Sequence, residues 1–478
     1  MAQFGEIPIS RRGACGALLA AALWRPAQAQ QLPAGELRIG LEFEPATLDP
    51  HFRDRPPDRQ IAAHIFEPLL RQGDDGRLAP VLALSWRQRD AAHWQFDLRP
   101  EVRFHDGGAF TAEDVAFSIE RARRVPEADA SFAAAAGAIA EIRVLDPLTL
   151  LIAAAVPDTD LPALMARLPI VSKRAAAGPA PEGRPSSDFD SGAAAVGTGP
   201  YRFGQWVQGD RLVLTASPDW WGGQAQWRQV VFRPVPHDAR RVILLRQGEL
   251  DLIENPPRPA LGGLRRDPDV AVAEILSARL VHVALDASSA ELRLAADSQI
   301  ANPLRDARVR EALDLAIDRR QILRNVLQGE GAVATGLAPP QGDAGPPAGS
   351  DAGFNPARAR KLLADAGLVE GFPLTLAAPE GRFANADGIA REVAGMWARI
   401  GVRTTVELLA ADARRRPPDE SRPAALQAGI NLAGPDAVAA RTVLPLLFEN
   451  AVWASRAGIA YRPRRDQWTL AQNALRAP

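Results

Sequence analysis

Alternating apolar and polar residues predict a strand-rich first half of the chain. The most regular stretch begins at Trp94, where every second residue up to Leu98 is apolar. After Pro100 the alternation resumes through Val102 and Phe104, so we predict two strands separated by a turn. Further strands are predicted at residues 37–41, 201–206, 211–215, 230–234, 251–253 and 270–286.

Helical periodicity and end signals predict helices that become dominant in the second half. Thr111 caps a helix with Asp114 at its third position, an acidic variant of the capping box. Asn355 caps another helix, which has Pro356 at its first position and Gly367 just past its end. The other helices are predicted at residues 60–70, 237–248, 309–326 and 389–400.

Two segments rich in proline and glycine divide the chain, at residues 173–200 and 336–356. Strands separated by helical segments are typical of mixed α/β lobes. At about 150 residues per domain, the 478 residues correspond to roughly three domains. Residues 414–423 are predicted to be an exposed connector, and no fixed-period repeat is visible.

The amino-terminal residues predict an export signal. Arg11 and Arg12 are followed by an uncharged stretch at residues 13–23 and by the sequence AQA at 27–29, whose two alanines suit signal-peptidase cleavage. We therefore interpret residues 1–29 as a signal peptide, which places the mature protein in the periplasm.

The export route is expected to be Sec rather than twin-arginine, because Gly13 and Ala14 follow the arginine pair where a twin-arginine signal usually has bulkier apolar residues. No segment is long and apolar enough to cross a bilayer as a helix, so we do not expect a membrane-spanning protein. Cys15, the single cysteine, lies in the leader. The mature chain then has no disulfide, thiolate metal site or cysteine nucleophile.

Composition and charge exclude several classes of protein. The chain has 56 Lys+Arg residues against 57 Asp+Glu residues, which argues against a nucleic-acid binder. Apolar residues make up 47% and charged residues 24%, so a disordered tail or a collagen is also excluded.

Signatures of catalysis and metal binding are missing from the sequence. The six histidines are scattered, with no pair at i, i+3 or i, i+4. There is no G-x-S-x-G, H-E-x-x-H or G-x-x-x-x-G-K motif. We expect no metal, no cofactor, no catalytic residue and no enzyme. An exported hydrolase stays as a less favoured alternative, because catalytic groups can converge from distant positions.

Residues 94–107 (WQFDLRPEVRFHDG) and 110–115 (FTAEDV) resemble the signature strand pair and helix start of family 5 of the extracellular solute-binding proteins. This family supplies the peptide-binding components of bacterial ABC importers. The other matches occur in order along the chain: TLDP at 47–50, FEPL at 66–69, GTGPY at 197–201, DWWGG at 219–223, GELDL at 248–252, VREAL at 309–313, AIDR at 316–319 and LLADAG at 362–367.

The resemblance implies an α/β fold of the two-lobed periplasmic-binding-protein type (class II, cluster C), with an extra subdomain inserted in lobe one. Lobe one would consist of residues 30–70, 186–285 and 450–478. The inserted subdomain would span residues 71–185, and lobe two residues 286–449.

The resemblance also implies function and site residues. The protein would be a monomer that captures peptides in a cleft between the lobes and delivers them to a membrane permease. The loop with Glu44, Ala46 and Thr47 would line the cleft from lobe one. The remaining ligand-binding candidates are Trp221, the carboxylate-binding Arg382, its neighbour Phe383, and Asp436.

The chain departs from its relatives between residues 410 and 444, where lobe two is much shorter. In peptide-binding relatives this stretch supplies the carboxylate that holds the peptide α-amine, and Asp436 is at best a remnant of it. The alternatives are therefore a binder of another solute (an oligosaccharide, an opine or a chelated metal), a degenerate paralogue without a ligand, and a protein that binds only a macromolecular partner.

Overall fold

The structure is a computed structural model. It describes residues 35–53, 55–73, 77–125, 136–157, 160–180, 183–293, 299–337, 339, 353–379, 385–409, 424–429 and 435–477. The expected signal peptide at residues 1–29, the connector at residues 414–423, and the candidate residues Arg382 and Phe383 lie outside these ranges.

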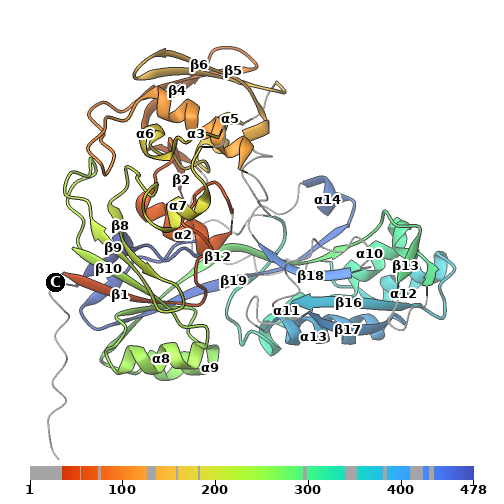
Figure 1. The fold of residues 1–478 in the computed structure, drawn as a ribbon. Coiled ribbons are helices and arrows are strands. Elements are labelled where there is room, and N and C mark those ends of the chain that lie inside the picture. Colours follow the sequence, from red (N-terminus) through yellow and green to blue (C-terminus); the bar gives the residue numbers. More distant parts are fainter. Residues whose placement is uncertain are drawn as a thin grey trace, which may run out of the picture.

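Two long antiparallel strands, β12 (Val270–Leu285) and β19 (Val443–Arg456), run through both lobes (Figure 1). They belong to an eleven-stranded sheet, counted over the described residues. In lobe one the sheet continues with β11 (Leu252–Glu254), β1 (Glu36–Leu41), β10 (Gln229–Pro234), β9 (Arg211–Ala216) and β8 (Tyr201–Val207). In lobe two it continues with β18 (Ala424–Gly429), β16 (Pro373–Pro379) and β17 (Arg403–Leu409), and the short β15 (Ala332–Val333) pairs with β19. The two-lobed α/β fold expected from the sequence is confirmed.

The pairing of β12 with β19 is interrupted where the lobes meet. Residues 277–279 of β12 lie opposite the single residue Glu449 of β19, and we call this interruption the hinge bulge. The Ala278 N–H donates to the carbonyl oxygen of Arg465 at 2.8 Å instead of to β19. Bulges of this kind bend a strand and increase its twist, so the sheet changes direction between the lobes.

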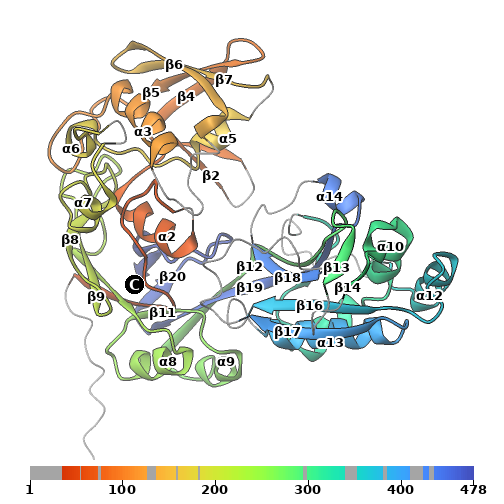
Figure 2. The ribbon, with the colours of Figure 1, turned by 45° about the vertical axis from the view of Figure 1, so that its right-hand side comes forward.

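Helices cover both faces of the lobe one sheet, as parallel strands require (Figures 1 and 2). α2 (Pro56–Ile65) buries Ile61 and Ile65 in one core. α8 (Asp238–Arg246) and α9 (Arg258–Leu264) bury a second core on the opposite face. The sequence placed the first helix at residues 60–70. It begins earlier because proline is favoured in the first turn of a helix.

Lobe two has its own core, in which four helices pack with β12, β16, β18 and β19. These helices are α10 (Ala307–Leu315), α11 (Arg319–Asn325), α12 (Pro356–Asp365) and α13 (Ala386–Ala398). The predicted cap of α12 is confirmed, because the Asn355 side chain accepts a hydrogen bond from the Arg358 N–H at 3.0 Å. Gly367 follows the helix with φ +79°, a conformation that glycine adopts without strain.

A second, four-stranded sheet forms the subdomain at the top of Figure 1. Its strands are β4 (Ala83–Gln88), β5 (His93–Leu98), β7 (Thr149–Ala154) and β6 (Ile139–Asp146), in that order. α3 (Ala112–Arg124) packs on it, and its predicted capping box of Thr111 and Asp114 is present. The predicted strand at Val102 and Phe104 is wrong: the Phe104 N–H donates to the Gly108 carbonyl in a tight turn.

The remaining elements are short. They are β2 (Leu70–Gln72), β3 (Leu78–Pro80), α5 (Leu161–Met165), α6 (Lys173–Ala176), α7 (Ser186–Asp190), β13 (Glu291–Arg293), β14 (Gln299–Ala301), η1 (Pro303–Arg305), α14 (Pro435–Ala439), β20 (Ile459–Tyr461), η3 (Ala471–Asn473) and β21 (Ala474–Arg476).

A buried ion pair joins the four-stranded subdomain to lobe one. Both guanidinium Nη atoms of Arg121 on α3 donate to the Asp49 carboxylate, at 2.8 and 2.6 Å. Ser186 donates a third hydrogen bond to Asp49 at 2.8 Å. Burial alone would raise the pKa of Asp49, but the Arg121 guanidinium holds it below the ordinary value.

Replacing Arg121 by methionine should therefore destabilise the protein strongly. The variant keeps the bulk but leaves the Asp49 carboxylate buried without its counter-charge, which costs about 3–5 kcal/mol. Urea unfolding at pH 7 measures the loss. Lys173→Met, which breaks an exposed pair with Glu113, is the control and should stay close to wild type. Equal stabilities of the two variants would contradict this account of the joint.

Candidate functional site at the junction of the lobes

The carboxyl ends of parallel strands from both lobes point toward the hinge bulge. In lobe one β1 is parallel to β10 and β11, and in lobe two β16 is parallel to β17 and β18. The register confirms their direction: Glu254 at the end of β11 pairs with Trp453, and Gly429 at the end of β18 pairs with Leu280. In open α/β sheets ligands bind outside the carboxyl ends of the strands, so this junction is the candidate site.

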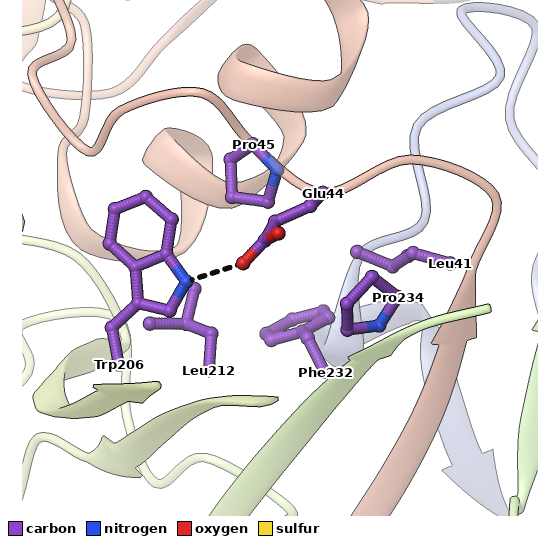
Figure 3. A pocket seen from close by; sticks show the side chains of 7 residues that line it. All are labelled: Leu41, Glu44, Pro45, Trp206, Leu212, Phe232 and Pro234. Atoms are coloured by element: carbon purple, nitrogen blue, oxygen red, sulfur yellow. Dashed lines mark hydrogen bonds between the residues drawn. The ribbon is translucent and has the colours of Figure 1, made fainter. Parts of the chain in front are cut away.

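Glu44 lies in the loop that follows β1, and its carboxylate is already bonded within lobe one (Figure 3). It accepts hydrogen bonds from Nε1 of Trp206 at 3.0 Å and from the Gly209 N–H at 2.9 Å. Glu44 lines a small pocket together with Leu41, Pro45, Trp206, Leu212, Phe232 and Pro234. All of these residues belong to lobe one.

The next two candidates, Ala46 and Thr47, are fixed by two carboxylates. The backbone N–H groups of both residues donate to Asp58, at 2.6 and 3.3 Å. The Thr47 hydroxyl donates to Asp190 at 2.7 Å. Burial raises the pKa of Asp58 and Asp190, and the hydrogen bonds only partly offset it. Thr47 is buried, whereas Ala46 is exposed to solvent.

Trp221 lies where lobe one meets the four-stranded subdomain. Its Nε1 donates to Glu67 at 2.7 Å, and Trp220 and Thr198 donate to the same carboxylate at 3.3 and 3.0 Å. The Arg99 guanidinium lies 4.2 Å from the centroid of the Trp221 ring. Burial raises the pKa of Glu67 even though three neutral donors surround it. The structure therefore ties the Trp221 indole N–H into an internal network.

Asp436 lies in lobe two, on the short helix α14 beside the end of β19. Figures 1 and 2 show α14 at the top of lobe two, on the side that faces the four-stranded subdomain. Its side chain is exposed. The structure thus places the described candidates on a lobe one loop, on an internal joint and on lobe two, and it does not bring them into one set of contacts.

Charged residues at the hinge bulge were missed by sequence reasoning. Glu449 is only 3% exposed, and its Oε1 has no hydrogen-bond partner among the described residues. Nε and Nη1 of Arg258, which begins α9, are buried and likewise lack partners in the part of the chain that is described. One signal was available in the sequence: Glu449 is the only ionisable residue between Val443 and Ser455, a run that reads as a buried strand.

No three His, Cys, Asp or Glu side chains come together as a metal site within the described ranges. Over the same residues, no helix has the length and apolar character needed to span a membrane.

Comparison with known proteins gives concordant matches. The family model for bacterial extracellular solute-binding proteins, family 5, matches residues 77–442. The periplasmic oligopeptide-binding protein OppA of Escherichia coli strain K12 is 30% identical over 354 residues, which cover 70% of this chain and 63% of OppA. The match thus spans less than two thirds of the length of that relative.

Solved structures match the fold over nearly the whole chain. The oligopeptide-binding protein AppA from Bacillus subtilis, in complex with a nonapeptide, superposes with a TM-score of 0.73 at 17% identity, over 93% of this chain and 99% of AppA. AgaA from A. tumefaciens R10, in complex with agropinic acid, gives a TM-score of 0.73 at 20% identity, with coverages of 93% and 99%.

Replacing Glu67 by glutamine tests the network that holds Trp221. The amide has one oxygen where the carboxylate has two, and its NH₂ group would face an indole donor, so we expect a loss of about 1–3 kcal/mol in the free energy of unfolding. Urea unfolding followed by tryptophan emission measures it. Glu249→Gln, at an exposed pair with Arg233, is the control. A Glu67→Gln protein as stable as this control would show that the network contributes little.

Proposed function

This chain belongs to the bacterial extracellular solute-binding proteins, family 5, and from that premise we propose that it captures peptides between its two lobes and delivers them to the membrane permease of an ABC importer. OppA and AppA are described by their names as oligopeptide-binding proteins. The proposal extends their ligand class to this chain.

One structural observation carries the proposal: of the described strands, β12 and β19 are the pair that passes from one lobe into the other, and they separate at the hinge bulge. Apart from a small cluster at the bulge itself, where Leu276 packs against Leu280 and Phe448, the lobes have separate cores, so they can move as bodies about this bulge. A ligand that touches both lobes favours the closed arrangement by its differential affinity. The permease would recognise that arrangement, and no covalent step is needed.

We further propose that the protein works in the periplasm as a monomer after export by the Sec route. The relatives support the location, since OppA is described as periplasmic. Binding and release without turnover is the proposed mode of action, with no catalytic residue, cofactor or metal.

The ligand-contacting residues remain those proposed from the sequence. Lobe one would contribute the loop with Glu44, Ala46 and Thr47, and lobe two would contribute Arg382 with Phe383 and Asp436. Because the Trp221 N–H and the Glu44 carboxylate already have partners, these two side chains would contact a ligand through their remaining surface.

A different small solute is the second candidate ligand. AgaA, which shares this fold, was solved with agropinic acid. At the hinge bulge, Oε1 of Glu449 and Nε and Nη1 of Arg258 have no partner among the described residues, and they suit a small molecule that carries both charge signs. Identifying the solute that natively purified protein carries distinguishes a peptide ligand from another small solute.

The proposal predicts that protein purified from its native periplasm carries peptides. The protein is denatured, and the released small molecules are identified by mass spectrometry. Recovery of peptides supports the proposal, and recovery of another solute replaces peptides by that solute. An empty protein that also fails to bind a peptide library in calorimetry contradicts ligand capture.

A further inference from the structure

Five polar residues from four parts of the chain meet at the hinge bulge, and we call them the hinge charge cluster. Glu42 follows β1, Asn255 and Arg258 follow β11, Arg279 lies in the bulge of β12, and Glu449 lies opposite it on β19. The charges of Arg279, Arg258 and Glu42 are close enough to Glu449 to shift its pKa. The cluster therefore lies at the hinge bulge, at the carboxyl ends of the lobe one strands.

Glu42 is satisfied within this cluster. Its Oε2 accepts a hydrogen bond from Nδ2 of Asn255 at 3.0 Å. Its backbone N–H donates to Glu254 at 2.7 Å, and Glu254 also accepts from the Thr469 hydroxyl at 2.7 Å. These carboxylates have the donors that buried acidic groups normally find in folded proteins.

Glu449 and Arg258, in contrast, each have buried side-chain atoms that lack such hydrogen bonds to other described residues. Within the described chain, Oε1 of Glu449 has no donor, while Nε and Nη1 of Arg258 have no acceptor. The two side chains feel each other's charge but form no ion pair with each other. Leaving a buried charge unpaired is costly. Burial raises the pKa of Glu449, and the two neighbouring arginines only partly oppose this shift.

A ligand group that satisfied both side chains would donate hydrogen bonds and carry positive charge toward Glu449, and it would present an acceptor oxygen toward Arg258. The amino end of a peptide has this chemistry. Its ammonium group offers three donors, and the first carbonyl group is bonded to the same α-carbon. Charge-assisted hydrogen bonds of this kind are about twice as strong as neutral ones.

We propose that Glu449 binds the α-ammonium group of the peptide and that Arg258 donates to its first carbonyl oxygen. This inference rests on the proposed function and names the ligand class more closely: peptides with a free amino end, held at the hinge bulge. Glu449 would thus take the role that the resemblance gave to Asp436. A ligand anchored at the hinge bulge can reach either lobe.

Glu449 suits this role better than Asp436. The Asp436 side chain is exposed on a helix of five residues. An ion pair formed there would be screened by water and would contribute at most about 1 kcal/mol. Glu449 is shielded from water, so the same pair is stronger there.

The test compares Glu449→Gln with wild type in the full mature chain. The probe is a random tripeptide library, either with free amino ends or N-acetylated, and retention by ultrafiltration is quantified by mass spectrometry. Wild type should retain the free library at least about tenfold better than the acetylated one. The variant should lose this preference, because its amide carries no charge for the ammonium group.

Glu330→Gln is the control variant and should keep the preference. It changes a carboxylate that binds Asn450 and Arg265 beside the hinge bulge, outside the cluster. Asp436→Asn tests the competing assignment, in which the exposed carboxylate of lobe two holds the ammonium group. If Glu449→Gln keeps the preference, or if only Asp436→Asn loses it, the inference is overturned. Wild type that retains neither library contradicts the proposed function itself.

Arg258→Met gives a second test that does not depend on how Glu449→Gln folds. Both forms of the library carry the first carbonyl oxygen, so this variant should lose retention of both by a similar factor. Circular dichroism melting confirms that each variant is folded at the temperature of the assay. Unchanged retention by folded Arg258→Met would contradict the part assigned to the guanidinium.

Discussion

One sheet is shared by two lobes, and the pairing of the strands that carry it from one lobe to the other opens at the hinge bulge. On either side, the apolar side chains of β12 and β19 are buried in separate cores. Burial therefore stabilises each lobe internally and leaves the bulge as the place where their relative orientation can change. The candidate site lies at the same place, since the carboxyl ends of the parallel strands converge there.

Local rules predicted much of the secondary structure. The Asn355 cap, the Pro356 start and the positive φ of Gly367 all follow from side-chain and backbone chemistry within a few residues. The capping box of Thr111 follows in the same way. Alternation failed at Val102 and Phe104, because the backbone there forms only an isolated β-bridge, between Arg103 and Ala109, around a tight turn.

Long-range pairing and side-chain partners were beyond these rules. Nothing local shows that β12 and β19, far apart in sequence, would carry one sheet through both lobes. The resemblance located the loop with Glu44, Ala46 and Thr47 but not the partners of Glu44, which lie on and after β8. Glu449 was overlooked because periodicity assigns a buried strand without showing which neighbours its one charged residue meets.

The central claim is that ligand binding closes the lobes about the hinge bulge. Residues 30–478 contain no cysteine, so a protein comprising them can be spin-labelled at Leu145→Cys on β6 and Val369→Cys in lobe two, both exposed in the structure. Pulsed electron resonance then gives the distance between them with and without peptides recovered from the native protein. The account predicts a shorter and narrower distance distribution with peptide, and an identical distribution in both states would contradict it.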